Sequence, residues 1–214
     1  MKLETNKLII KVCGMRDAAN IVALSQLPID YMGFIFYPPS PRFVGDILNN
    51  AVLEQIPKSI KKIGVFVNET LKDVERTAEK FKLDGIQLHG SEISDYCLAL
   101  KDKGYIVIKA FKGETETLTC ETAAYRFACD YFLFDTPSIR YGGSGRKFDW
   151  SILEQQKLHR PFFLSGGIDL EDVERIKSIA IPELYAVDIN SRFEISPGIK
   201  DIEKIKKFIE KIRL

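Results

Sequence analysis

The chain of 214 residues is 45% hydrophobic, and its 31 basic and 30 acidic residues give a formal net charge of +1 at pH 7. This length and apolar content suit a single large core, so residues 1–214 are expected to form one domain. The balanced charge argues against a binder of nucleic acid or of anionic membranes, and no run of about 18 apolar residues predicts a membrane-spanning helix.

Short apolar runs rich in β-forming residues alternate along the chain with longer segments of helical periodicity. Strands that are apolar on both faces are typical of parallel sheets with both faces covered, and eight strand–helix pairs predict an α/β fold, a closed (β/α)8 TIM barrel. An open doubly wound sheet is the less favoured alternative, because no G-x-G-x-x-G motif follows the first run. The predicted strands are residues 8–13, 31–36, 62–67, 84–88, 105–111, 130–134, 162–164 and 184–189. The first helical segment is capped by Asp17. The next are predicted at 47–56, 69–81 and 92–103, then a less regular stretch to 128, and helices that begin near 149, 169 and 200.

The last helix repeats an apolar face, and a basic amphipathic membrane helix is its less favoured interpretation. Residues 1–7 are too polar for a secretory signal peptide, so we expect a cytoplasmic protein with reduced thiols. The four cysteines show no C-x-x-C pair and no metal-ligand spacing. Three of them, Cys97, Cys120 and Cys129, are expected to be small buried fillers.

A set of polar residues follows the predicted strands, where the catalytic face of such a barrel lies. Cys13 ends the first run, and its position allows a nucleophile, a base or a packed core residue. Asp135 follows a strongly apolar run, whose desolvation would favour the neutral acid that a general acid requires; a capping or ion-paired aspartate is the alternative. The other members of the set are Arg42, Gln87, His89, Gly142 to Gly145, Ser165, Gly166, Gly167, Asp188, Asn190 and Ser191.

Two of these groups suggest a substrate class. Gly166 and Gly167 lead into a helix near Asp169, in the loop region where this barrel usually binds phosphate, although such a turn is also a common tight connection. Arg42 follows a proline-rich loop that would hold its guanidinium for a carboxylate or phosphate, or it lies on the surface. His89 contacts substrate or is structural. Since His159 is the only other histidine, a zinc or iron site is not expected.

Several segments together resemble the phosphoribosylanthranilate isomerase family, an aldose–ketose isomerase of tryptophan biosynthesis. They span nearly the whole chain in the family's order. The matching segments are Lys11-Val12-Cys13-Gly14, Gly33 to Tyr37, Ser40-Pro41-Arg42, Gly64 to Asn68, Gln87 to Gly90, Gly142 to Gly145, Phe148-Asp149-Trp150, Ser165 to Ile168, Val187-Asp188, Ser191, Ser196-Pro197-Gly198 and Lys200-Asp201.

The resemblance implies a (β/α)8 barrel that converts N-(5-phosphoribosyl)anthranilate to 1-(2-carboxyphenylamino)-1-deoxyribulose 5-phosphate without a cofactor or metal. It implies that Cys13 is the general base, Asp135 the general acid, and Arg42 the anchor of the anthranilate carboxylate. Further substrate contacts are expected from Gln87, His89 and Asp188, and phosphate contacts from Gly143, Ser144, Gly145, Gly166, Gly167, Asn190 and Ser191. The expected partner is this small molecule alone, with the oligomeric state open between monomer and homodimer.

An unperturbed thiol is only a few per cent ionised at neutral pH. We therefore predict that the pKa of Cys13 is lowered or that Cys13 ionises on substrate binding. One residue departs from the family: Arg192 stands where a glycine is common, so the shape of the phosphate turn is in question. The alternatives are a histidine-pathway isomerase, which has an aspartate in place of Cys13 and a two-fold repeat, a metal-dependent epimerase, which needs more histidines, and a catalytically silent phosphate-binding barrel.

Overall fold

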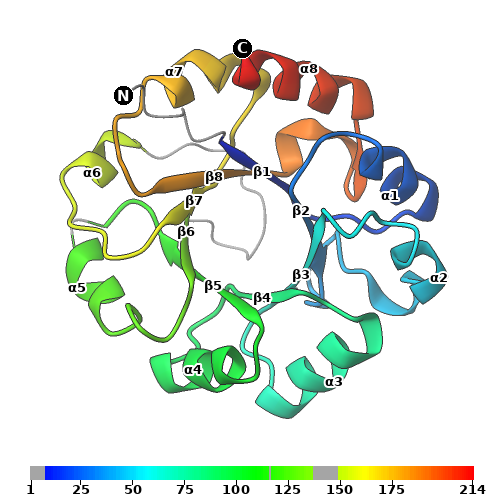
Figure 1. Ribbon diagram of the computed structural model, residues 1–214, viewed down its shortest axis with the longest axis horizontal. Helices are drawn as coiled ribbons and strands as arrows, with labels where there is room; N and C mark the ends of the chain where they lie inside the picture. The colour runs from blue at the N-terminus through cyan, green and yellow to red at the C-terminus, as the bar shows by residue number, and fades with distance from the viewer. Residues whose placement is uncertain (1–7, 116, 137–148) are drawn as a thin grey trace.

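The computed structural model describes residues 8–115, 117–136 and 149–214, and its centre is a closed barrel of eight parallel strands (Figure 1). The predicted TIM barrel is confirmed and the open sheet is wrong, because β1 pairs with β8 from Ile9↔Ala186 to Val12↔Ile189. The strands are β1 Ile9–Val12, β2 Tyr31–Ile35, β3 Lys61–Phe66, β4 Gly85–Leu88, β5 Ile106–Lys112, β6 Tyr131–Asp135, β7 Phe162–Leu164 and β8 Leu184–Ile189.

Helices surround the barrel and cover its outer face (Figure 1). They are α1 Ala18–Ser25, α2 Asn50–Leu53, α3 Leu71–Phe81, α4 Ser94–Asp102, α5 Leu118–Ala123, α6 Ser151–Glu154, α7 Val173–Lys177 and α8 Ile202–Arg213. Three 3₁₀ turns, η1 Gly45–Ile47, η2 Leu170–Asp172 and η3 Ser191–Phe193, and a hairpin of β9 Glu194–Ser196 and β10 Ile199–Lys200 complete the described elements.

Amphipathic periodicity explains the longer helices. In α3 the residues Val74, Ala78 and Phe81 are buried at helical spacing, and Thr70 caps the helix by accepting from the Asp73 amide. In α8 the predicted apolar face packs inward, so the interpretation as a membrane-surface helix is wrong. Among the described residues, no helix is long and apolar enough to cross a membrane.

The predicted helix 47–56 is mostly wrong. Residues 45–47 form the turn η1, Leu48 is extended, and Asn49 caps only the short α2 by accepting from the Ala51 amide. Helical periodicity across this segment therefore reflects two short turns that bury Leu48 and Leu53 rather than one helix. The hairpin β9–β10 was not predicted, and α8 starts two residues later than expected because Asp201 is its cap.

The cysteine expectation is confirmed for Cys97 and Cys129, which are buried, and wrong for Cys120, which is exposed. Cys120 lies in α5, where Leu118 and Thr122 occupy the buried positions and leave its own thiol on the solvent side. His159 is exposed, as expected.

Side chains that alternate along the strands fill the inside of the barrel in two zones. The zone nearer the strand starts is apolar, with an aromatic contact between Tyr31 and Phe163 at 5.4 Å. The zone nearer the carboxyl ends contains Cys13, Ile35 and Val65 together with polar groups. Polar chemistry is therefore confined to one end of the barrel, as this fold favours.

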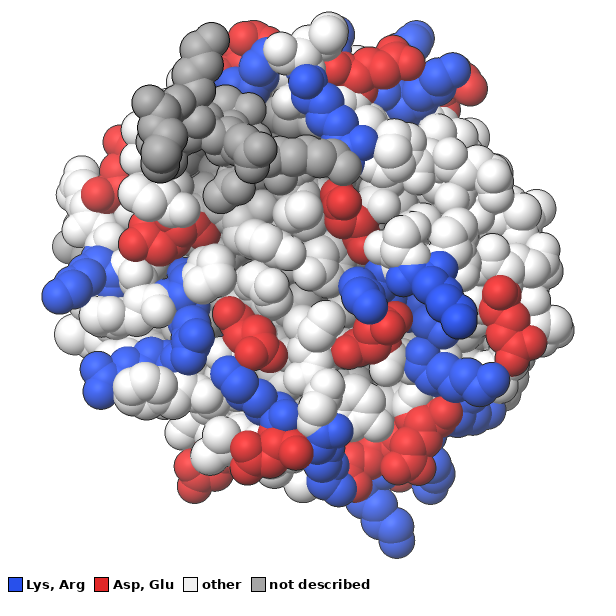
Figure 2. Space-filling view, viewed as in Figure 1, with Lys and Arg blue, Asp and Glu red and all other residues white. Residues whose placement is uncertain are grey.

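The outer surface mixes both signs of charge. On the face seen in Figure 2, Lys and Arg alternate with Asp and Glu around the rim, and the described residues of this face show no large patch of one sign. This distribution agrees with the net charge of +1 and gives no extended basic surface for a polyanion on that face.

Candidate active site

A pocket opens at the carboxyl ends of the strands and encloses about 500 Å³, including its mouth. A second, adjoining pocket of about 360 Å³ shares Asp135, Ser165, Asp188 and Asn190 with the first. The first is lined by Cys13, Gln87 and His89 with the apolar Ile35, Tyr37, Val65 and Val67, and the second by Gly166, Gly167, Ile168 and Ser191.

The structure thus brings together nine of the sequence-predicted site residues around two connected chambers: Cys13, Gln87, His89, Asp135, Gly166, Gly167, Asp188, Asn190 and Ser191. Arg42 lies beside them in the loop after β2, among contacts described below. The remaining three, Gly143, Ser144 and Gly145, lie outside the described residues.

Cys13 follows β1 and is held there by a hydrogen bond from its amide to the Ile189 carbonyl at 2.9 Å. Gly33 on the neighbouring strand makes room for the thiol, because a Cβ at that position would lie 2.7 Å from Sγ. Burial raises the pKa of the Cys13 thiol, against the opposing effect of the Lys11 ammonium. The predicted lowering of this pKa is therefore wrong, and ionisation on substrate binding is the branch that stays a prediction.

A lysine that sequence reasoning missed lies beside this thiol. Lys11 precedes Cys13 by two residues on β1, so both side chains point into the barrel. Its ammonium donates to Asp188 Oδ2 at 2.7 Å, and both side chains are almost fully buried. Although burial alone would lower the pKa of Lys11, the Asp188 and Cys13 groups outweigh it, so the pKa is raised and the ammonium stays charged. The signal in the sequence is a lysine inside an apolar strand.

Asp135 ends β6 and faces His89 across the pocket. Its Oδ2 lies 3.4 Å from His89 Nε2, and its Oδ1 accepts from the Thr136 amide at 2.9 Å. Gln87 Nε2 is 2.9 Å from His89 Nδ1; when Gln87 donates there, the neutral imidazole carries its proton on Nε2, toward Asp135. The side chain of Asp135 is 24% exposed, and Phe132 and Phe134 of the apolar run before it pack in the outer core.

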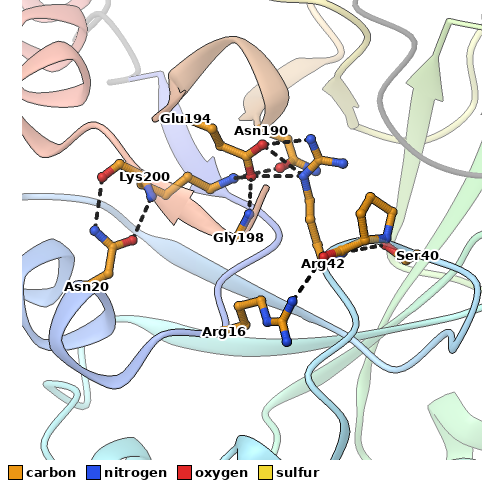
Figure 3. A network of polar contacts seen from close by, with 9 residues as sticks. Arg16, Asn20, Ser40, Arg42, Asn190, Glu194, Gly198 and Lys200 are labelled. Carbon is orange, nitrogen blue, oxygen red and sulfur yellow. Dashed lines mark hydrogen bonds and ion pairs between the residues drawn. The ribbon is translucent and has the colours of Figure 1, made fainter. Parts of the chain in front are cut away.

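The guanidinium of Arg42 is held by an internal carboxylate (Figure 3). Its Nε and Nη2 donate to Glu194 at 2.8 and 2.6 Å, so the predicted bidentate geometry exists, but with Glu194 as the acceptor. Lys200 Nζ donates to Glu194 Oε1 and to Asn190 Oδ1, each at 2.6 Å. Among the described residues no partner is found for Arg42 Nη1, and Arg42 itself lines neither pocket, although Ser40 of the same loop lines the first.

Electrostatics in this network follow from burial and pairing. Burial lowers the pKa of Lys200 to about 8, against the effect of Glu194. Burial alone would raise the pKa of Glu194, but hydrogen bonds and charges from Arg42 and Lys200 bring it below its usual value. Gly14 accommodates the network: its φ is +79°, and a Cβ there would lie 2.7 Å from Arg42 Cδ and 2.8 Å from Asn190 Oδ1.

The glycine turn after β7 differs from the expected helix terminus. Gly166 and Gly167 have φ of +93° and +68°, so the turn needs glycine. However, the following segment is the turn η2 and the five-residue α7, and Asp169 with Asp172 caps it internally. A helix dipole therefore adds little, and any phosphate contact here comes from the backbone of the turn itself.

Arg192 causes no strain in the neighbouring turn. Its φ is not among the positive values of the described residues, so this position of η3 does not require the glycine common in the family. Its carbonyl accepts from Lys204 Nζ at 2.7 Å, which ties η3 to α8.

Comparison with known protein families matches nearly the whole chain to a single family. The model of a family described as N-(5'phosphoribosyl)anthranilate (PRA) isomerase matches residues 10–211. The chain belongs to the N-(5'-phosphoribosyl)anthranilate isomerase family.

Relatives and solved structures of the family cover almost all of this chain. The isomerase of Parabacteroides distasonis is 47% identical over 206 residues, which is 96% of this chain and 93% of that protein. The crystal structure of the isomerase from Thermotoga maritima superposes with a TM-score of 0.84 at 32% identity, covering 96% and 98% of the two chains. A family structure in complex with reduced 1-(o-carboxyphenylamino)-1-deoxyribulose 5-phosphate has a TM-score of 0.79 at 30% identity, with 96% and 98% covered.

Glu194 offers a test of the network in this family member. In a Glu194→Gln variant the amide keeps the shape but loses the charge between two buried cations, so the free energy of unfolding is expected to fall by about 2 kcal/mol. Because Arg42 is then less well held, KM for an anthranilate ribotide should rise about tenfold while kcat changes less. Urea unfolding and steady-state kinetics measure the two effects, with the exposed Glu210→Gln on α8 as the control. Unchanged stability and KM would show that Glu194 does not position Arg42.

Proposed function

We propose that this chain catalyses the Amadori rearrangement of N-(5-phosphoribosyl)anthranilate to 1-(2-carboxyphenylamino)-1-deoxyribulose 5-phosphate, a step of tryptophan biosynthesis, in the cytoplasm. The observation that carries the proposal is the placement of Cys13 and Asp135 in one pocket that joins an apolar chamber to a glycine–serine chamber. Family membership along residues 10–211 supports it.

The two chambers suit the two ends of this substrate. Ile35, Val65 and Val67 offer an apolar surface for the anthranilate ring, and Arg42, two residues after Ser40 of the pocket lining, is the cation that we assign to its carboxylate. The backbone of Gly166 and Gly167, with Ser191 and Asn190, surrounds the chamber that we assign to the phosphate. The ribose would then lie between them, beside Asp135 and Asp188, which line both chambers.

The chemistry proceeds by proton transfers. Asp135 protonates the furanose ring oxygen, the C1′–O4′ bond breaks, and the nitrogen lone pair forms an iminium. The Cys13 thiolate then removes the C2′ proton, which gives an enolamine. Return of a proton to C1′ and loss of the C2′ hydroxyl proton yield the ketone. Each step needs one acid or one base and no change of oxidation state in the protein.

His89 and Gln87 support the acid in this scheme. When Gln87 donates to His89 Nδ1, the Nε2–H of His89 faces Asp135 Oδ2 and stabilises the carboxylate that remains after proton donation. Gln87 Oε1 is buried and has no partner among the described residues, so it is available as an acceptor for a substrate hydroxyl.

Turnover of the ribotide tests the proposal directly. The unstable substrate is generated in place from anthranilate and phosphoribosyl pyrophosphate by a transferase, and its fluorescence is followed after addition of the purified chain. We expect a rapid loss of fluorescence that depends on enzyme concentration. A folded protein that binds inorganic phosphate but leaves the fluorescence unchanged would instead be the catalytically silent barrel.

A further inference from the structure

The thiol of Cys13 has to carry a negative charge in a place that disfavours one. It is buried, and burial is the largest effect on its pKa, in the direction of the neutral thiol. A buried anion requires a partner of opposite charge within a few ångströms. The assignment of Cys13 as base and Asp135 as acid does not say which group is the cationic partner of the thiolate.

Two ammonium groups act on Cys13, and they differ in what else they bind. Lys200 lies on β10 and gives short hydrogen bonds to Glu194 and Asn190, so its charge is shared with another carboxylate. Lys11 lies on β1 two residues before Cys13 and on the same face, and both its charge and its hydrogen-bonding capacity lower the pKa of the thiol. Lys11 therefore has the larger effect of the two on the pKa of Cys13.

Asp188 works in the opposite direction on the same thiol. Its carboxylate fixes the Lys11 ammonium at 2.7 Å, yet its negative charge disfavours a thiolate. Asp188 Oδ1 is buried and has no partner among the described residues, although the side chain lines both chambers. A substrate hydroxyl that donates to Oδ1 would disperse part of the negative charge of Asp188. The Lys11 ammonium would then stabilise a thiolate at Cys13 more strongly.

We propose that Lys11, held in place by Asp188, is the positioning residue that stabilises the Cys13 thiolate, and that a substrate hydroxyl on Asp188 strengthens this effect. The proposal rests on the proposed function, in which Cys13 is the base. Lys11 keeps its three protons throughout. Cys13 first releases its thiol proton to solvent at the pocket mouth; the thiolate then takes the C2′ proton and later gives it to C1′. Other charged groups around the pair are His89 after β4, Asp135 at the end of β6, Arg42 after β2, and Lys200 with Glu194 in the hairpin.

The first measurement does not depend on turnover. The rate of Cys13 alkylation by iodoacetamide at fixed pH follows the thiolate fraction, and mass spectrometry of the Cys13 peptide reads it in a Cys120→Ser background that removes the exposed thiol. In Lys11→Met we expect the rate at pH 8 to fall about tenfold or more. In Asp188→Asn, where the opposing carboxylate is gone, we expect the rate to rise.

Lys109→Met is the matched control. Lys109 is also a buried lysine of the barrel wall, paired with Glu92 at 3.1 Å, but it lies on β5 and packs toward α4. Its loss therefore creates the same kind of unpaired carboxylate away from Cys13, and the alkylation rate should not change. Where Lys11→Met does not fold, the double variant Lys11→Met with Asp188→Asn removes both charges at once and should still alkylate more slowly than Asp188→Asn alone.

Kinetics give the second readout. In Lys11→Met, kcat/KM should fall about tenfold or more near neutral pH and recover about tenfold for each unit of rising pH, because the base is then limited by its ionisation. Equal alkylation rates in Lys11→Met and Lys109→Met would overturn the proposal, as would a loss of activity that no pH restores. A parent protein that fails to turn over the ribotide while the alkylation differences persist would contradict the proposed function and leave the Lys11 effect standing.

Discussion

A Cys13→Ser variant is expected to lose about 10³-fold or more in kcat while it folds normally. The alcohol is smaller than the thiol and fits beside Gly33, but its pKa is far higher, so almost no alkoxide is available to take the C2′ proton. KM should change little, because the side chain contributes little to ground-state binding. Fluorescence loss of the ribotide measures both constants.

The matched control is Cys120→Ser, which removes an exposed thiol on α5 and should leave both constants unchanged. Near-normal turnover by Cys13→Ser would show that another group is the base. The direction of the pH dependence is a further test. Because burial raises the pKa of Cys13, kcat/KM of the parent protein should rise with pH from neutral into the alkaline range. A profile that falls over this range would contradict a thiolate base.

An Asp135→Asn variant is expected to lose about 10²- to 10⁴-fold in kcat. The amide occupies the same space and can still contact His89 Nε2, but it has no proton acidic enough to open the furanose ring. Steady-state rates over a range of pH provide the measurement.

Asp130→Asn is the matched control for this variant. Asp130 lies just before the start of the same strand, where it accepts from the Val107 amide at 2.9 Å and pairs with Lys101 at 3.0 Å. Its replacement should reduce stability and leave kcat within about twofold. Similar losses of kcat in both variants would mean that Asp135 acts through the fold of β6 and not as the acid.

Local patterns in the sequence were enough to predict the barrel and the placement of Cys13 and Asp135 at one end of it. The apolar pattern of a strand can be recognised within a few neighbouring residues, and the carboxyl ends of parallel strands meet at one end in any closed barrel. The predicted bounds of β7 and β8 agree with the structure for the same reason.

Contacts between distant segments could not be predicted in this way. The partner of Lys11 lies 177 residues later and that of Arg42 lies 152 residues later, so no local spacing indicates either pair. Nothing in the local sequence singles out Glu194, because the hairpin that carries it has only a two-residue second strand. The raised pKa of Cys13 was also out of reach, since it depends on how deeply the thiol is buried.

The closure of the barrel between β1 and β8 has a consequence for the order in which the protein acquires its chemistry. The Lys11–Asp188 pair, the Arg42–Glu194 pair and the two hydrogen bonds between Asn20 and Lys200 all join the first 42 residues to residues 188–200. During vectorial synthesis these early segments emerge long before their partners, and contacts of such high sequence separation form late. An emerging chain can therefore build most of its wall while Cys13 still lacks its electrostatic surroundings, so catalytic competence arises only when the last strand docks.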